Sequence, residues 1–226
     1  MNKQPITKQK IDPDGYLFIQ EIFKSIQGEG PWVGKSVIFI RLQRCNLQCS
    51  WCDTEYTAGG IGVLSVKEIL EDLAISFNAN IRAIVITGGE PFAQNIAPLV
   101  NSLYDAGYEI QIETNGTLSL PAFPWNKVTL VCSPKLKSIH SDIYRNCEHF
   151  KYVTEMDEDG LAQLSQYKSS SYPPEVYNGE GKTIWLMPRD GDTIFEQTRN
   201  NKAALDLALE NGYNYSPRLH KDLGVR

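Results

Sequence analysis

The sequence has no long hydrophobic run, and this absence excludes several classes of protein. Across its 226 residues, no apolar stretch approaches the roughly 20 residues that a membrane-spanning helix needs. The run MNKQPITKQKIDPDGY at residues 1–16 also lacks the apolar core of about 7 to 15 residues found in secretory signal peptides. No internal repeat is visible. We therefore expect a cytoplasmic protein.

The sequence also lacks an excess of positive charge. It has 22 Lys and Arg against 27 Asp and Glu, which gives a formal net charge of -5. Proteins that bind a nucleic-acid backbone are usually basic, because they neutralise phosphate groups. We therefore expect neither nucleic acid nor membrane among its partners.

Cysteine and histidine are scarce, but three of the cysteines lie close together. The chain has five Cys and three His, and no histidine has a companion at the spacing of a metal site or a catalytic triad. An odd number of cysteines fits a reducing compartment better than a disulfide framework. Cys132 and Cys147 are expected to be buried thiols. The segment from Cys45 to Cys52 is instead a candidate metal site.

Short apolar runs alternate with helical patterns along most of the chain. We expect strands at residues 16–22, 37–42, 81–87, 109–114, 128–133, 150–154 and 183–187. A helix is expected after Ser65, whose spacing to Glu68 forms a capping box, and two more over residues 96–105 and 194–210. This alternation predicts a parallel α/β sheet in one domain over residues 1–226. Residues 54–64 are expected to form a loop and residues 168–181 an exposed loop.

Four segments with chemically useful side chains come directly after predicted strands. They are residues 45–52, 87–91, 113–116 and 133–135. Ligands of parallel α/β folds bind at the carboxyl ends of the strands. The sequence therefore predicts that these segments converge on one rim.

The cysteine spacing within RLQRCNLQCSWCDTEY is C-x3-C-x2-C. Three thiolates suit zinc or an iron–sulfur cluster. Structural zinc usually takes four ligands, so a zinc-binding scaffold would need Cys132 or a histidine as the fourth. A cluster that only transfers electrons also normally uses four cysteines. Three cysteines leave one iron open, and the spacing favours such a cluster.

A second signal is AIVITGGEP at residues 83–91. Paired glycines at the end of an apolar strand let the backbone approach a ligand closely. A glycine pair after a strand is also a common turn, so this segment gains weight only beside the cysteines.

Together these segments resemble the radical S-adenosylmethionine (radical SAM) superfamily, including an aromatic residue, Trp51, before the last cysteine. The resemblance implies a partial, open TIM-like barrel with mainly parallel strands. It also implies a [4Fe-4S] cluster on Cys45, Cys49 and Cys52, whose open iron binds S-adenosylmethionine. The GGEP segment then faces the methionine amino group.

A longer resemblance points to the 7-carboxy-7-deazaguanine synthases. It is carried in order by EIFKSIQGEGPWVGKSVIFIRLQRCNLQCSWCDT (21–54), TGGEP (87–91), ETNGT (113–117), SPK (133–135) and RLHK (218–221). These lyases convert 6-carboxy-5,6,7,8-tetrahydropterin to 7-carboxy-7-deazaguanine with loss of ammonia, in queuosine and 7-deazapurine biosynthesis. Two alternatives stay open: a radical SAM activase of another protein, and a zinc-binding scaffold that is not an enzyme.

The same resemblance implies roles for individual residues. The implied substrate-binding residues are Ile26, Gln27, Gly28, Arg41, Thr87 and, through its terminal carboxylate, Arg226. The implied cofactor-binding residues are Trp51, Cys52, Asp53, Gly89, Ser133, Pro134, Lys135, Met187, Pro188, Arg189 and Asp190. Thr54 is implied as a Mg2+ contact. The implied partners are a small pterin substrate, an electron donor such as flavodoxin or ferredoxin, and a second copy of the chain in a homodimer.

Two positions depart from the family pattern. Arg44 stands where many relatives have glycine, so we expect it either to alter the conformation of the cysteine loop or to add positive charge near the cluster. Met187 stands where glutamine is expected.

Overall fold

The computed structural model describes residues 2–57, 59–77, 80–167, 170 and 173–226. Its strands are β1 (Leu17–Ile26), β2 (Ser36–Leu42), β3 (Gly62–Leu64), β4 (Ala83–Gly88), β5 (Glu109–Thr114), β6 (Thr129–Cys132), β7 (His149–Met156), β8 (Ala162–Leu164), β9 (Thr183–Pro188) and β10 (Asn214–Tyr215). Its α-helices are α1 (Val66–Ser76), α2 (Ala97–Asp105), α3 (Ser141–Asn146), α4 (Ile194–Asn211) and α5 (Leu219–Asp222), and its short 3-10 helices are η1 (Gly30–Trp32), η2 (Pro91–Ala93) and η3 (Trp125–Lys127).

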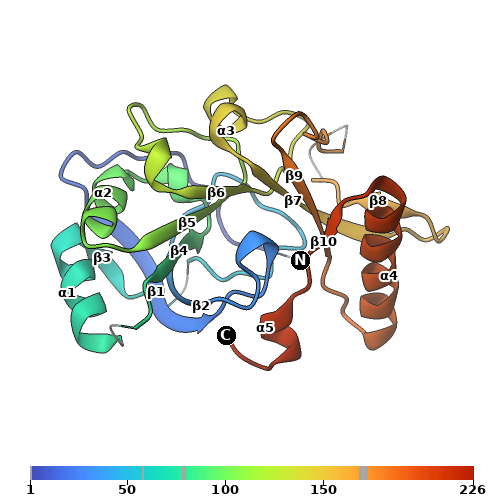
Figure 1. Cartoon of the computed structure of the whole chain (residues 1–226), viewed down its shortest axis with the longest axis horizontal. Coiled ribbons are helices and arrows are strands. Elements are labelled where there is room, and N and C mark those ends of the chain that lie inside the picture. Colours follow the sequence, from blue (N-terminus) through green and yellow to red (C-terminus); the bar gives the residue numbers. More distant parts are fainter. Residues whose placement is uncertain (1, 58, 78–79, 168–169, 171–172) are drawn as a thin grey trace.

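The described strands form one open, mostly parallel sheet (Figure 1). Their order is β10-β9-β7-β6-β5-β4-β2-β1-β3, and β8 pairs with β7 outside this path. Along this path, pairing is parallel from β2 to β10 and antiparallel where β1 meets β2 and β3; β8 pairs antiparallel with β7. The order does not close on itself, so the predicted open barrel is confirmed. The segment expected as a loop at residues 54–64 ends in β3, a short strand that pairs with β1.

Helices cover one face of this sheet, and the alternation of side chains along each strand explains why. On β2, β4 and β5 every second residue, such as Ile40, Ile86 and Ile112, is fully buried in the main core with residues of α1, α2 and α3. The residues between them point to the opposite, concave face. Arg41 and Glu113 lie there because each is one position from a core isoleucine.

The described residues of the loop expected at 168–181 contain no helix or strand, and most of them are exposed, as predicted. Residues 168–169 and 171–172 lie outside the described part of the chain. Of the described residues, Pro174 is buried, and Val176 and Tyr177 pack against the main core. Among all described residues, no helix has both the length and the apolar character needed to cross a membrane.

Candidate active site

The concave face of the sheet holds a cavity of about 780 Å³. Its wall contains most of the residues that the sequence nominates: Gln27, Arg41, Cys45, Cys49, Trp51, Cys52, Asp53, Thr54, Thr87, Gly89, Ser133, Lys135, Met187, Pro188, Arg189, Asp190 and Arg226. Ile26, Gly28 and Pro134 lie outside this wall. The expected convergence of four segments on one rim is therefore what the structure shows.

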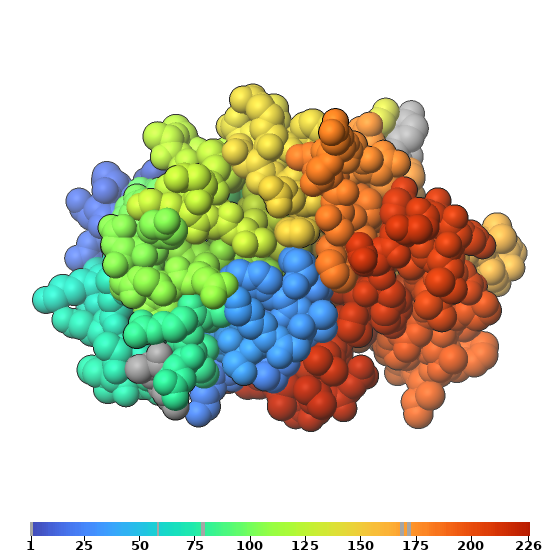
Figure 2. All heavy atoms as spheres, viewed as in Figure 1, coloured from blue at the N-terminus to red at the C-terminus, as the bar shows by residue number. Residues whose placement is uncertain are grey.

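Gly28 lies outside the cavity wall and packs against the C-terminal segment. A Cβ atom on Gly28 would lie 2.0 Å from Nδ1 of His220, so only glycine permits this approach. The backbone nitrogen of Leu219 also donates to the Gly28 carbonyl oxygen at 3.1 Å. Figure 2 shows the resulting contact between the segment near residue 30, in blue, and the C-terminal segment, in red. His220 itself lines the cavity, although no sequence signal nominated it.

The three cysteines of the loop line the cavity and have their own hydrophobic surroundings. Cys45 packs with Leu47, Tyr56 and Tyr167 in a small core separate from the main one. Burial raises the pKa of Cys45 to about 12, and burial also raises the pKa of Cys49 and Cys52. Thiols in such surroundings deprotonate on binding a metal rather than as free groups.

This arrangement fits an iron–sulfur cluster better than a single metal ion. Within the described residues, no group of three or more His, Cys, Asp or Glu side chains is arranged to hold one ion. Thiolates that bind different irons of a cluster do not have to converge on one point. The fourth zinc ligand considered above, Cys132, is fully buried in the main core with Cys147.

The paired glycines Gly88 and Gly89 let the backbone of β4 approach neighbouring segments of the chain closely. A Cβ atom on Gly88 would lie 2.2 Å from the carbonyl oxygen of Leu42, and one on Gly89 would lie 1.9 Å from that of Arg44. Gly88 also has a φ of 131°, which favours glycine. The missing side chains therefore let β4 pack against the start of the cysteine loop, and Gly89 faces the cavity as a result.

Arg44 takes the conformation that glycine favours. Its φ is 72°, in the left-handed region, and its guanidinium lies 3.8 Å from the centre of the Phe18 ring. The departure from glycine therefore keeps a glycine-like backbone. The side chain stacks on Phe18 and is not part of the cavity wall, so neither of the two expected consequences of Arg44 is seen.

This geometry predicts an order of stability for two variants. Arg44→Ala loses the stacking on Phe18 and keeps the unfavourable φ, so we expect it to lower the free energy of unfolding by about 1 kcal/mol. Arg44→Gly loses the same contact but removes the unfavourable φ, so it should be more stable than Arg44→Ala by about 0.5–1 kcal/mol. Urea unfolding of the cluster-free proteins measures both values. The reverse order would contradict this account of Arg44.

One end of the cavity presents two guanidinium groups. Nε of Arg41 donates to Glu21 at 2.8 Å, and its Nη1 donates to the hydroxyl of Thr54 at 3.3 Å. The guanidinium of Arg226 also pairs with Glu21 and lies over the ring of Phe23. An oxygen of the terminal carboxylate of Arg226 accepts a hydrogen bond from Ser25. The side chains of Arg41 and Arg226 therefore share Glu21 as their partner.

A buried cluster of ion-paired side chains lies on the cavity wall. The sequence did not reveal this cluster. Nζ of Lys151 on β7 is 2.5 Å from Glu29 and 3.5 Å from Glu113. Glu113 also accepts hydrogen bonds from Gln27 at 3.0 Å, from Thr87 at 3.3 Å and from Gln111 at 3.4 Å. Burial opposes ionisation of Glu113, but Lys151 and the first two of these hydrogen bonds hold its pKa below the usual value.

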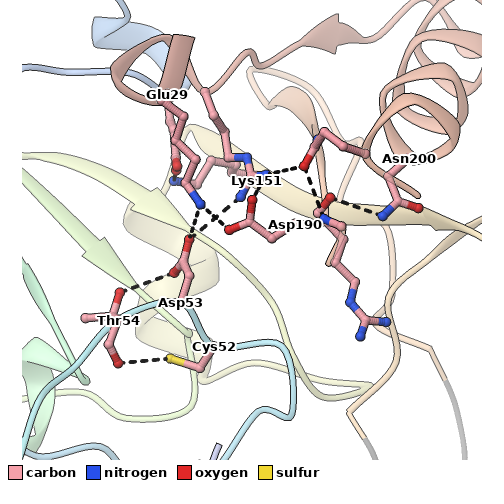
Figure 3. Close-up of polar contacts among 12 residues, drawn as sticks. Glu29, Cys52, Asp53, Thr54, Lys151, Asp190 and Asn200 are labelled. Carbon is pink, nitrogen blue, oxygen red and sulfur yellow. Dashed lines mark hydrogen bonds and ion pairs between the residues drawn. The ribbon is translucent and has the colours of Figure 1, made fainter. Parts of the chain in front are cut away.

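A second cluster of ion-paired side chains joins three segments that are distant in the sequence (Figure 3). Asp53, which follows the last cysteine, lies 3.8 Å from Arg218 and 3.7 Å from Lys221. Both cations also pair with Asp190 at the end of β9. Although burial opposes it, these hydrogen bonds hold the pKa of Asp190 below its usual value. The C-terminal segment is therefore fixed to the cysteine loop and to the loop after β9.

Hydrogen bonds fix the segments that were nominated for cofactor binding. The carbonyl oxygen of Met187 accepts from Thr154 at 3.1 Å, and that of Arg189 accepts from Asn200 of α4 at 3.2 Å. Nζ of Lys135 donates to Ser133 at 2.6 Å. A rigid wall of this kind can position a bound cofactor against the open side of the cysteine loop.

Known proteins agree with this description. The family model of the radical SAM superfamily matches residues 39–124. The 7-carboxy-7-deazaguanine synthase of Rhodospirillum rubrum is 35% identical over 92% of this chain and 92% of its own length. The enzyme of the same name from Thermoplasma acidophilum is 43% identical over 91% of this chain and 96% of its own length. The crystal structure of QueE from Escherichia coli has a TM-score of 0.65 at 22% identity and covers 89% of this chain and 93% of that chain.

An open, mostly parallel α/β barrel with three cysteines on its cavity is the architecture of a radical SAM enzyme, with a [4Fe-4S] cluster and S-adenosylmethionine as cofactors. Within that class, the chain belongs to the 7-carboxy-7-deazaguanine synthase family, whose members are lyases. The alternatives of an activase and of a zinc scaffold are therefore set aside.

Proposed function

We propose that the protein converts 6-carboxy-5,6,7,8-tetrahydropterin to 7-carboxy-7-deazaguanine with release of ammonia. The observation that carries this proposal is that the three-cysteine loop and Arg41 open into one cavity of about 780 Å³. When bound, the cluster and S-adenosylmethionine supply the one-electron chemistry that removes a hydrogen atom from the substrate. The chain must then bind a flat heterocycle with one carboxylate and hold its reacting carbon towards the cysteine loop.

Arg41 is suited to bind the substrate carboxylate. A guanidinium can donate two parallel hydrogen bonds to a carboxylate, and Arg41 already does so in part with Glu21. Burial lowers the pKa of Arg41, but an arginine stays charged at neutral pH. Gln27, directly after β1, and Thr87 on β4 both line the cavity, and Ile26 and Gly28 flank Gln27 in the chain. In this proposal the side chain of Arg226 assists Arg41.

Glu29 and Glu113 are suited to bind the other edge of a pterin. Ionised carboxylates accept hydrogen bonds, and the aminopyrimidine edge of a pterin presents N–H donors. Lys151 pairs with both carboxylates and holds the pKa of Glu113 below its usual value. A carboxylate-binding group on β2 together with a carboxylate on β5 would fix the orientation of the substrate.

The cofactor contacts and the remaining partners belong to the same proposal. S-adenosylmethionine would contact Trp51, Cys52, Asp53, Gly89, Ser133, Pro134, Lys135, Met187, Pro188, Arg189 and Asp190. Thr54 would contact Mg2+ beside the substrate, where Asp53 Oδ1 lies 3.4 Å from its hydroxyl. We further propose a flavodoxin or ferredoxin as electron donor, a homodimer and a cytoplasmic location.

The experiment is an anaerobic assay of the reconstituted enzyme. We expect purified protein with cluster, S-adenosylmethionine, Mg2+ and a chemical reductant to form 7-carboxy-7-deazaguanine from the carboxytetrahydropterin, detected by mass spectrometry. Cleavage of S-adenosylmethionine without this product would contradict the proposed substrate but not the radical SAM class.

Arg41→Ala should lose substrate turnover and keep cofactor cleavage. Loss of a charge-assisted contact to the substrate carboxylate should lower kcat/KM by roughly 10- to 100-fold. Cleavage of S-adenosylmethionine without substrate should stay within about twofold of wild type, because Arg41 is not in the cysteine loop. Arg41→Lys serves as control and should recover only part of the loss, since an ammonium lacks the planar fork. An unchanged kcat/KM would show that another group binds the carboxylate.

A further inference from the structure

Residues 2–10 form an extended segment that packs against the cysteine loop from outside the cavity; we call it the N-terminal strap. It contains no helix or strand, and none of its residues lines the cavity. Figure 1 marks the N-terminus in the middle of the view rather than at its edge. The family resemblance and the proposed reaction assign this polar segment no role.

Gln4 contacts the cysteine loop after its last cysteine and between its first two cysteines. Its side-chain Nε2 donates to the carbonyl oxygen of Thr54 at 2.7 Å, and its Oε1 accepts from the backbone nitrogen of Tyr56 at 2.7 Å. The amide thus bonds to both residues that flank Glu55, as a neighbouring β-strand would. The carbonyl oxygen of Gln4 also accepts from the side chain of Gln48 at 2.6 Å.

Thr7 holds the other end of the same loop. Its backbone nitrogen donates to the carbonyl oxygen of Cys45 at 2.7 Å, and its hydroxyl donates to the same oxygen at 3.2 Å. The strap therefore reaches the first cysteine through Thr7 and the residues after the last cysteine through Gln4.

The cysteine loop needs such support because its own backbone provides little. Residues 45–57, all of which are described, contain no helix or strand. Unpaired backbone groups in a partly buried loop must find other partners, and here the strap supplies several of them. A loop that is free to change conformation would not keep three thiolates at the separation that a cluster requires.

We propose that the N-terminal strap keeps the cysteine loop in its ligand-binding conformation, with Gln4 as the principal positioning residue. The proposal rests on the assignment of Cys45, Cys49 and Cys52 as cluster ligands. Gln4 touches neither cluster nor substrate and acts through the backbone of the loop. Its loss should therefore accelerate release of the cluster without preventing its assembly.

The test compares Gln4→Ala with Gln9→Ala, a matched control on the same strap. The amide of Gln9 donates to the carbonyl oxygens of Phe92 and Ser119, at 2.7 and 2.9 Å, and no described contact joins it to the cysteine loop. Both variants and wild type are reconstituted anaerobically with ferrous iron and sulfide. The readouts are the rate of iron release to a chelator, the EPR spectrum of the reduced cluster and the Tm of the cluster-free protein.

We expect Gln4→Ala to release iron roughly tenfold faster than wild type, as the loss of two partly buried amide hydrogen bonds implies. Its EPR spectrum should broaden because the thiolates sample more than one arrangement, and its Tm should match that of Gln9→Ala. Gln9→Ala should release iron within twofold of wild type. Equal release by the two variants would overturn the strap proposal alone. Wild-type protein that takes up iron without sulfide would overturn the cluster assignment and the strap proposal with it.

Discussion

Cys45→Ala, reconstituted anaerobically with iron and sulfide, is expected to hold no stable [4Fe-4S] cluster and to cleave no S-adenosylmethionine above background. The three thiols of the loop line one cavity, and each is needed because an iron without its thiolate is exposed to exchange and loss. Cys49→Ala and Cys52→Ala should behave alike. Iron and sulfide analysis, the visible absorbance of the cluster and the yield of 5′-deoxyadenosine measure the effect.

The matched control is Cys147→Ala. This variant removes a buried thiol that is not part of the cysteine loop. Cys147 is fully buried in the main core, where its sulfur donates to the carbonyl oxygens of Leu130 and His149. This variant should lose some stability but bind a full cluster and cleave the cofactor. A full cluster in Cys45→Ala, or none in Cys147→Ala, would mean that the ligands are misassigned.

The sequence predicted the regular elements well where local signals are strong. The capping box at Ser65 is present, with the backbone nitrogen of Ser65 2.8 Å from Glu68 and that of Glu68 3.2 Å from the Ser65 hydroxyl. Gly212 ends α4 with a φ of 66°, as expected for a C-terminal cap. The strand at residues 109–114 matches β5 exactly in its bounds. Each of these signals depends on residues close together in the chain.

Elements that depend on distant partners were missed or misjudged. The segment before Leu64 became a strand because it pairs with β1, which no local pattern could show. The close approach of the glycines at 88 and 89 to Leu42 and Arg44 could not be predicted either, because it depends on the pairing of β4 with β2. The strap residue Gln4 carries no recognisable motif, and its role follows only from the fold.

The ionic part of the site was hidden for a related reason. Lys151 lies one position from the core residues Phe150 and Tyr152, so alternation predicts only that it faces away from the core. A charged residue at such a position is usually exposed to solvent. The opposite face of this sheet is instead a closed cavity wall, and only the fold reveals that Lys151 meets Glu29 and Glu113 there.

Lys151→Met should lower the free energy of unfolding by about 3–5 kcal/mol at pH 8, because it leaves buried carboxylates without their cation. The side chain of Lys151 is only 5% exposed and those of Glu29 and Glu113 only 15% and 20%, so water from the cavity replaces the lost contacts only in part. Methionine keeps most of the length and volume of the lysine chain. The loss would therefore come from charge rather than from a cavity.

The size of this loss should depend on pH in a definite direction. In the native protein the pKa of Glu113 lies below its unfolded value of 4.5, so the paired carboxylate stabilises the fold above that pH and loses this effect as pH falls. Without Lys151, Glu113 loses the cation that offsets the effect of its burial, so the pKa of Glu113 rises. Its ionisation then destabilises the fold as pH increases. The difference in stability between the two proteins should thus grow from pH 5 to pH 8.

Chemical denaturation at pH 5, 6.5 and 8 tests this prediction, with Lys127→Met as the matched control. Lys127 pairs with Asp105, whose side chain is 72% exposed, so its loss should cost under about 1 kcal/mol and vary little with pH. Adding Glu113→Gln to Lys151→Met should recover part of the stability at pH 8, since it removes one uncompensated charge. A loss that stays constant across this pH range, or that Glu113→Gln deepens, would show that Lys151 stabilises the fold by packing alone. The carboxylates proposed to bind the pterin edge would then have to be kept ionised by some other group.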